Sequence, residues 1–174
     1  MITFRKATVS DIDAIADIYD EIHTEIELGK ANTGWIRGVY PTRKTAEASV
    51  MLGDMFVMEI GGKIIAAARI NKQQVDVYAD VNWKYKAEDE NVMVIHTLVV
   101  TPAEKGKGYG TKFVDFYERF AKENGCSALR MDTNEKNLAA RALYKKLGYR
   151  EAGIVPCTFN GISGVGLVCL EKKI

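Results

Sequence analysis

A glycine-rich turn is the segment of this sequence whose residue types and spacing most directly suggest chemistry. It lies at 105–112, between the apolar run 92–100 and a segment with helical periodicity. Glycine lets backbone N–H groups approach a bound anion closely, and the N-terminus of a following helix adds positive potential. Three glycines and three lysines make up most of the turn: Gly106, Gly108 and Gly110 with Lys105, Lys107 and Lys112. The pattern predicts a site for a phosphate or pyrophosphate group.

The turn does not match the common nucleotide-binding motifs. Thr111 occupies the position of the third glycine in a G-x-G-x-x-G fingerprint, and also the position of the P-loop lysine after the last glycine. A protein kinase would also carry an H-R-D motif, which is absent from this sequence. Two interpretations remain, a phosphate site of another class and a tight connection that uses glycine for its backbone alone.

The residues around the turn predict a mixed α/β fold that positions it. Apolar periodicity and turn residues give seven strands and four helices in the order β-α-α-β-β-β-α-β-α-β-β. Gly61-Gly62 is expected to join two of the strands as a hairpin. Because hairpins and βα units are both present, we expect a twisted mixed sheet in a single domain over 1–174. The predicted strands cover 2–7, 55–60, 63–70, 92–100, 127–133, 149–155 and 164–171.

The predicted helices begin at capping residues and end at glycines. The first is expected to run from a Ser10 cap to Gly29, with His23 on its surface. The fourth is expected to run from an Asn134 cap to Gly148. The other two cover 42–52 and the segment from the glycine turn to Gly125. The fourth helix is predicted to bury Leu138, Ala142 and Leu143.

The composition argues against several classes of protein. The 24 basic and 23 acidic side chains give a net charge of +1, without the basic excess of a nucleic-acid binder. No apolar run reaches the roughly 20 residues of a membrane span, and the acidic N-terminal segment does not resemble a secretory signal. The three cysteines form no CxxC pair, so we expect reduced thiols in a cytoplasmic protein without a metal site. They are Cys126, Cys157 and Cys169.

Seven acids between 11 and 27, with no lysine or arginine among them, leave two interpretations open. One is a solvated helix face, and the other is a surface that steers a cationic substrate.

Two motifs resemble the GNAT superfamily of N-acetyltransferases. The letters KGKGYG at 105–110 are similar to its [QR]-x-x-G-x-[GA] motif, with Lys105 in place of the usual glutamine or arginine. The letters NLAARALYKKLGY at 137–149 are similar to its N-x-x-A-x-x-x-Y-x-x-x-G-[FY] motif. HTLVVTP, just before the turn, resembles the family's fourth strand. The resemblance extends over essentially the whole chain.

The resemblance implies that acetyl-CoA is the cofactor. The turn would hold its pyrophosphate through main-chain N–H groups, and the fourth strand would pair with the pantetheine arm. Asn137 matches the residue that contacts this arm, and Tyr144 matches the residue that donates a proton to the departing thiolate. The implied cofactor residues are Leu98, Val99, Val100, Lys105, Gly106, Lys107, Gly108, Tyr109, Gly110, Thr111, Asn137 and Tyr144.

His96 is the predicted proton acceptor for the reacting amine. Strand alternation is expected to place it on the same face as Leu98 and Val100. An unperturbed histidine titrates near pH 6.5, which suits proton removal at neutral pH. A histidine two residues before the matching leucine assists proton removal in one family member, serotonin N-acetyltransferase. A purely structural strand histidine is the alternative, and the fallback bases are Glu88, Asp89 and Glu90.

The resulting hypothesis is an N-acetyltransferase that moves acetyl directly from acetyl-CoA to a primary amine of a small molecule or peptide. Cys157 has no paired base in the sequence, which argues against a covalent acyl-enzyme. A monomer or homodimer without metal, nucleic acid or membrane is expected. A non-catalytic acyl-CoA-binding regulator and a nucleotide-binding domain are the alternatives. The predicted walls of the acceptor pocket are Trp35, Tyr40, Tyr78, Trp83 and Phe159.

Overall fold

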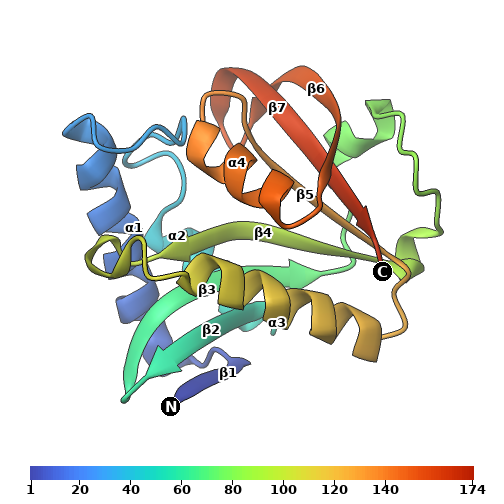
Figure 1. Ribbon diagram of the computed structural model, residues 1–174. Helices are drawn as coiled ribbons and strands as arrows, with labels where there is room; N and C mark the ends of the chain where they lie inside the picture. Colours follow the sequence, from blue (N-terminus) through green and yellow to red (C-terminus); the bar gives the residue numbers. More distant parts are fainter.

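The computed structural model describes all residues from 1 to 174, and it contains one seven-stranded mixed sheet with four α-helices. The strand order is β1-β2-β3-β4-β5-β7-β6 (Figure 1). The strands are β1 (Ile2–Lys6), β2 (Met55–Ile60), β3 (Lys63–Asn71), β4 (Val92–Val100), β5 (Ala128–Asn134), β6 (Arg150–Phe159) and β7 (Ile162–Lys173). The helices are α1 (Ile12–Glu27), α2 (Arg43–Met51), α3 (Tyr109–Glu123) and α4 (Leu138–Lys146). The predicted fold class is confirmed.

The pair β4 and β5 is the parallel one, and every other neighbouring pair is antiparallel. A parallel pair needs a crossover connection, and α3 provides it. The two strands pair only from Val92 to Val94 and from Ala128 to Arg130. Beyond this point they separate, as Figure 1 shows, and the sheet divides between β4 and β5.

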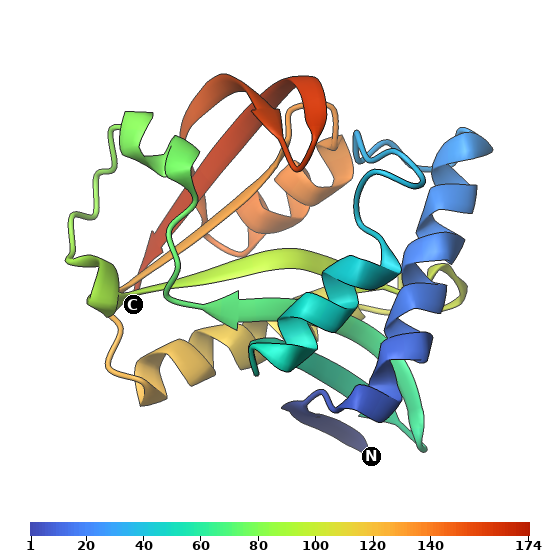
Figure 2. The same cartoon turned by 180° about the vertical axis from the view of Figure 1, so that it is seen from behind.

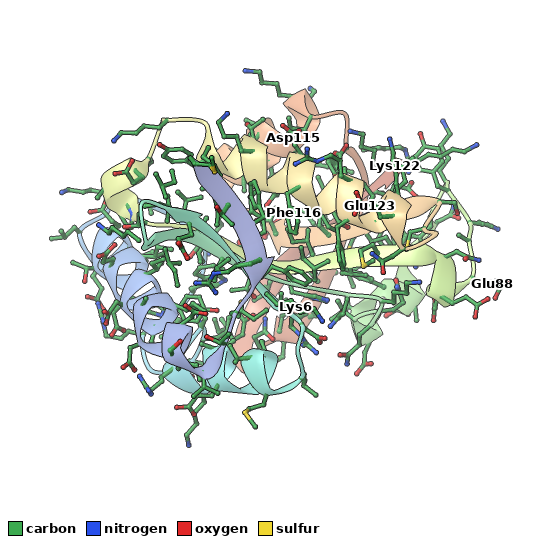
Figure 3. The ribbon with its side chains drawn as sticks, turned by 90° about the horizontal axis from the view of Figure 1, so that it is seen from below. Lys6, Glu88, Asp115, Phe116, Lys122 and Glu123 are labelled. Atoms are coloured by element: carbon green, nitrogen blue, oxygen red, sulfur yellow. The ribbon has the colours of Figure 1, made fainter.

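Helices cover both faces of the sheet. Figure 2 shows α1 and α2 on one face, where their apolar residues pack with Val57, Ala67 and Val99. On the other face, Phe113 and Tyr117 of α3 are fully buried. Figure 3 shows Phe116 of α3 beside β1, where its ring stacks on Phe4 at a centroid distance of 4.6 Å. The core therefore consists of two layers, one on each side of the strands.

Two predicted helix caps are wrong. Asp11, rather than Ser10, is the N-cap of α1, which follows a 3-10 turn at Val9–Asp11 that has Thr8 as its N-cap. The Asp11 carboxylate accepts hydrogen bonds from the Thr8 backbone N–H at 2.7 Å and from the Thr8 hydroxyl at 3.0 Å. Asn137, rather than Asn134, caps α4, and its Oδ1 accepts from Ala140 N at 3.2 Å. Leu138 is 70% exposed and Ala142 is also exposed, against prediction.

The predicted hairpin at Gly61-Gly62 is confirmed, with φ angles of +59° and +80°. The last two strands extend further than predicted, because β6 and β7 remain paired up to the Asn160-Gly161 turn. None of the helices combines the length and the apolar character that crossing a bilayer requires.

Candidate functional site

A cleft of about 1060 Å³ lies where β4 and β5 separate. Its walls come from the open ends of these strands, the turn 104–111, the start of α4, and the loop 30–40 beside α1. Ligand sites typically measure about 300–1,000 Å³. This cleft therefore has room for an elongated cofactor arm together with a second, smaller molecule.

The glycine turn presents open main chain at one end of the cleft. Gly106 and Gly108 have φ angles of +83° and +78°, a region that favours glycine, and a Cβ at either would meet no atom within 4 Å. Neither amide donates to a backbone carbonyl. The amides of Tyr109, Gly110 and Thr111 lie in the first turn of α3, where no preceding turn accepts them. These free donors at a helix N-terminus can hold a phosphate or pyrophosphate.

The lysines of the turn contribute less than the sequence suggested. Lys105 lines the cleft. The ammonium of Lys107 lies 2.8 Å from Glu104 Oε2, and neither Lys107 nor Lys112 lines the cleft. An anion at the turn would therefore be bound mainly by backbone amides, and the Lys107 side chain contributes less charge there than the sequence suggested.

A bulge in β4 marks the middle of the cleft. Thr97 and Leu98 together oppose the single residue Ala68, and Thr97 has a φ angle of +53°. A β-branched residue with positive φ is a rare, strained conformation, and such strain is concentrated at functional sites. The hydroxyls of Thr97 and Tyr40 hydrogen-bond to each other across the cleft.

The bulge corrects the predicted orientation of His96. Leu98 and Val100 pack against the core on the α3 side, whereas His96 pairs in register with Arg69 and hydrogen-bonds Asn71 at 3.0 Å. Since the extra residue interrupts the alternation, His96 faces the α1–α2 side instead. Burial and the positive charge of Arg69 lower the pKa of His96 to about 4. His96 lines the cleft, but it is uncharged at neutral pH and a weaker base than expected.

The acids at 88–90 lie outside the cleft. They precede β4 at the end where it still pairs with β5. Figure 3 shows Glu88 at the periphery of the molecule, where all three acids are exposed. The structure therefore does not bring the predicted fallback bases to the site.

Asn137 and Tyr144 of α4 both line the cleft, as the motif at 137–149 predicted. Because Asn137 uses Oδ1 for its cap, its amide N–H groups remain free to donate. Tyr144 is 8% exposed, and its ring packs edge-to-face on Tyr149 at 6.0 Å. Burial and the negative charge of Asp132 raise the pKa of Tyr144, so its hydroxyl keeps its proton at neutral pH.

Three of the five predicted acceptor aromatics line the cleft: Trp35, Tyr40 and Phe159. Tyr78 and Trp83 do not, which corrects that prediction. They are buried against each other behind β5, and Trp83 Nε1 donates to the Tyr78 carbonyl at 2.9 Å. Their segment folds over the outer part of the sheet, where aromatic rings fill the core.

Asp132 is a cleft residue that the sequence analysis missed. It lies on β5, two residues beyond the last β4–β5 pair, and its Oδ2 accepts a hydrogen bond from Tyr78 Oη at 2.7 Å. Burial raises the pKa of this carboxyl to about 6. An acid that directly follows the apolar Met131 in the strand segment SALRMDT was the available signal.

The acidic run at 11–27 is largely paired within the molecule. Asp11 bonds Arg5 at 2.7 Å, and Glu27 bonds Arg37 at 2.8 Å. These pairs favour the interpretation as a helix surface over substrate steering. The prediction that His23 lies on the helix surface is wrong. Its side chain is 2% exposed, and its Nε2 lies 2.9 Å from the Pro41 carbonyl oxygen.

The cysteines are free: Cys126 and Cys169 are buried, and Cys157 is half-buried. Cys157 does not line the cleft.

Comparisons with known proteins agree with this geometry. Residues 13–149 match the model of the acetyltransferase (GNAT) family. An uncharacterised N-acetyltransferase of Methanocaldococcus jannaschii is 28% identical over 88% of this chain, and this chain spans 62% of that protein's length. The uncharacterised N-acetyltransferase YhfO of Bacillus subtilis is 24% identical over 84% of this chain and 89% of its own.

A solved structure shows the same fold. A GNAT-family acetyltransferase of Streptococcus agalactiae superimposes with a TM-score of 0.82, at 22% identity, over 99% of this chain and 95% of that one. Since the family model covers most of the chain, including the glycine turn and α4, the chain belongs to the acetyltransferase (GNAT) family.

Proposed function

We propose that the protein transfers an acetyl group from acetyl-CoA to a primary amine of a small molecule or peptide. One observation carries the proposal. A single cleft joins an open anion-binding turn at one end, the separated strands β4 and β5 in the middle, and the aromatic wall of Trp35 and Tyr40 at the other. Such a cleft can hold a long phosphorylated cofactor and an acceptor at the same time.

The residues of the cleft fit acetyl-CoA. Backbone amides of 106–111 would bind the pyrophosphate, because Gly106 and Gly108 leave the adjacent space open. The edge of β4 from Leu98 to Val100, no longer paired with β5, would accept the pantetheine arm in the manner of an added strand. The Asn137 amide would donate to the same arm. The bound cofactor supplies the activated acetyl group as a thioester.

The chain's own groups then have separate tasks in direct transfer. Tyr144 holds a proton that the departing sulfur can accept, and its buried ring fixes the position of that proton. The aromatic wall excludes water and orients the acceptor amine. A cleft acid or His96 removes the proton of the attacking nitrogen.

The test is incubation with acetyl-CoA and a panel of primary amines, including alkylamines, amino acids and peptides, with release of free thiol as the readout. We expect thiol release with at least one amine and a higher melting temperature with acetyl-CoA than with ATP. Stabilisation without thiol release for any amine would indicate a non-catalytic acyl-CoA-binding protein. Stabilisation by ATP rather than acetyl-CoA would indicate a nucleotide-binding domain.

A further inference from the structure

Asp132 stands at the point where the sheet divides. The last bonded position between the parallel strands is Val94 with Arg130, and Asp132 follows two residues later. Leu129 and Met131 belong to the core on the α3 side. Alternation along β5 therefore places Asp132 on the opposite face, which is the acceptor side of the cleft.

Asp132 differs from the other carboxylates of the cleft. Glu25 and Glu104 also line it, but each is paired with a lysine. No ion pair forms at Asp132, whose hydrogen-bond partner is the neutral hydroxyl of Tyr78. A half-buried carboxylate without a cation is costly unless a ligand or a proton neutralises it. The acceptor amine can neutralise this carboxylate, because it can bind beside it as a cation or transfer a proton to it.

The surroundings of Asp132 allow it to titrate near neutral pH. Burial raises its pKa to about 6, and the hydrogen bond from Tyr78 acts in the opposite direction. A base with a pKa near the working pH is ionised and still able to accept a proton. The ionisable groups around it are Tyr40, Tyr78, Tyr144, Cys157 and Cys169, while Arg69 and His96 line the β3–β4 wall of the same cleft.

We propose that Asp132 accepts the proton from the attacking nitrogen of the acceptor amine. This inference rests on the proposed acetyl transfer. The nitrogen forms a bond to the thioester carbonyl carbon and passes one proton to the Asp132 carboxylate. The carbon–sulfur bond breaks with its electron pair on sulfur, which takes the hydroxyl proton of Tyr144. Solvent then removes the proton from Asp132 and returns one to Tyr144, so that the net proton transfer is from nitrogen to sulfur.

The first experiment compares wild type, D132N and H96Q on the best amine of the panel, as kcat/KM from pH 5 to 9. Asparagine keeps the shape of Asp132 and can still accept from Tyr78. Protonation of the amine lowers kcat/KM at acidic pH in every variant. In wild type we expect a further loss of kcat/KM below about pH 6, caused by protonation of Asp132. D132N should be about 10²–10⁴-fold slower at neutral pH and lack this additional loss, while its acetyl-CoA affinity by calorimetry stays unchanged. H96Q should keep the additional loss near the same pH.

A second variant tests the titration itself. Y78F keeps the buried ring and removes the hydrogen bond that favours the ionised carboxylate. In Y78F, the loss of kcat/KM at acidic pH should therefore begin at a higher pH than in wild type. A purely structural role of Asp132 would not produce this shift. In the free protein, the carboxyl carbon of Asp132 observed by NMR should titrate near pH 6 in wild type and higher in Y78F. D115N, which removes an exposed carboxylate of α3 (Figure 3), is the matched control and should leave the profile unchanged.

The outcomes separate this inference from the proposed function. If D132N matches wild type in rate and profile while wild type acetylates amines, Asp132 is not the proton acceptor and the proposed function stands. If the additional loss of kcat/KM below about pH 6 disappears in H96Q and persists in D132N, His96 is the proton acceptor. If wild type releases no thiol with any amine, both proposals are overturned.

Discussion

Burial acts on two titratable side chains of the cleft with opposite consequences for chemistry. It raises the pKa of Tyr144, so that its hydroxyl remains a proton donor. It also raises the pKa of Asp132, to about 6, so that this carboxyl approaches the range in which it can accept a proton at neutral pH. In the proposed transfer, Tyr144 of α4 would therefore serve as the acid and Asp132 of β5 as the base.

Replacing Tyr144 by phenylalanine tests the donor. Y144F keeps the ring and its packing on Tyr149, so the free energy of unfolding should change by less than about 1 kcal/mol. Turnover should fall by about 10²–10⁴-fold, because the sulfur then leaves without a proton. Y149F is the matched control, since the Tyr149 hydroxyl bonds Glu118 at 3.0 Å and does not line the cleft. Full turnover in Y144F would show that Tyr144 serves packing alone.

The stability of D132N should depend on pH in a defined direction. The folded protein holds a proton on Asp132 up to about pH 6, whereas the unfolded chain releases it near the ordinary aspartate pKa of 3.8. The wild-type carboxyl therefore contributes stability below the unfolded pKa that is lost as pH rises through 6. D132N should be more stable than wild type at pH 7.5, by about 1–3 kcal/mol, and equal to it below about pH 4. Urea unfolding at both pH values measures this, and equal stability at both would contradict the raised pKa.

At the scale of elements, the site depends on two interruptions of regular structure. The bulge at Thr97 reverses the alternation of β4, and the left-handed Gly108 starts α3 directly after the turn. Each interruption leaves backbone groups without partners next to the cleft, and a ligand can then use them.

The anion-binding role of the turn can be tested at Gly108. G108E places a negative side chain in the open space beside the free amides, so acetyl-CoA affinity should fall at least about 10-fold. Gly125 offers a matched control at the other end of α3, because its φ is +74° and a Cβ there also meets no atom within 4 Å. G108E and G125E should therefore lose similar stability, while only G108E loses affinity in calorimetry. Equal acetyl-CoA affinity of the two variants would show that the pyrophosphate does not bind at this turn.

The whole molecule is a sheet in two parts, joined by the short parallel pairing of β4 with β5. The turn belongs to the first part, and α4 with Asp132 belongs to the second. A ligand in the cleft contacts both parts, so its binding should restrain the open ends of the two strands.

Hydrogen exchange measured with and without acetyl-CoA tests this coupling. We expect slower exchange of the backbone amides at 97–111 and 132–140, because ligand contacts and restrained strand ends reduce local opening. Residues 56–68 of the β2–β3 hairpin do not line the cleft and serve as the internal control. Protection confined to the hairpin, with none in the cleft segments, would contradict binding between β4 and β5.

The fold class and the residues at one end of the cleft could be predicted from local patterns in the sequence. Periodicity located the helices, Gly61-Gly62 located a hairpin, and the motifs at 105–110 and 137–149 placed Gly108 and Tyr144 at the cleft. These features are local, because turn geometry, helix capping and side-chain period depend on residues close in the chain.

The residues at the other end of the cleft depend on contacts between segments that are distant in the chain. Whether His96 shares a face with Leu98 depends on a bulge that forms against β3, and no local pattern at 92–100 indicates it. Tyr78 and Trp83 were predicted to line the acceptor pocket, but their segment packs over the outer part of the sheet, where both side chains are buried. Asp132 became a candidate base because β5 separates from β4 beside it and Tyr78 reaches it from 54 residues away. Orientation and pKa both depend on which distant groups surround a side chain, and that environment exists only in the folded protein.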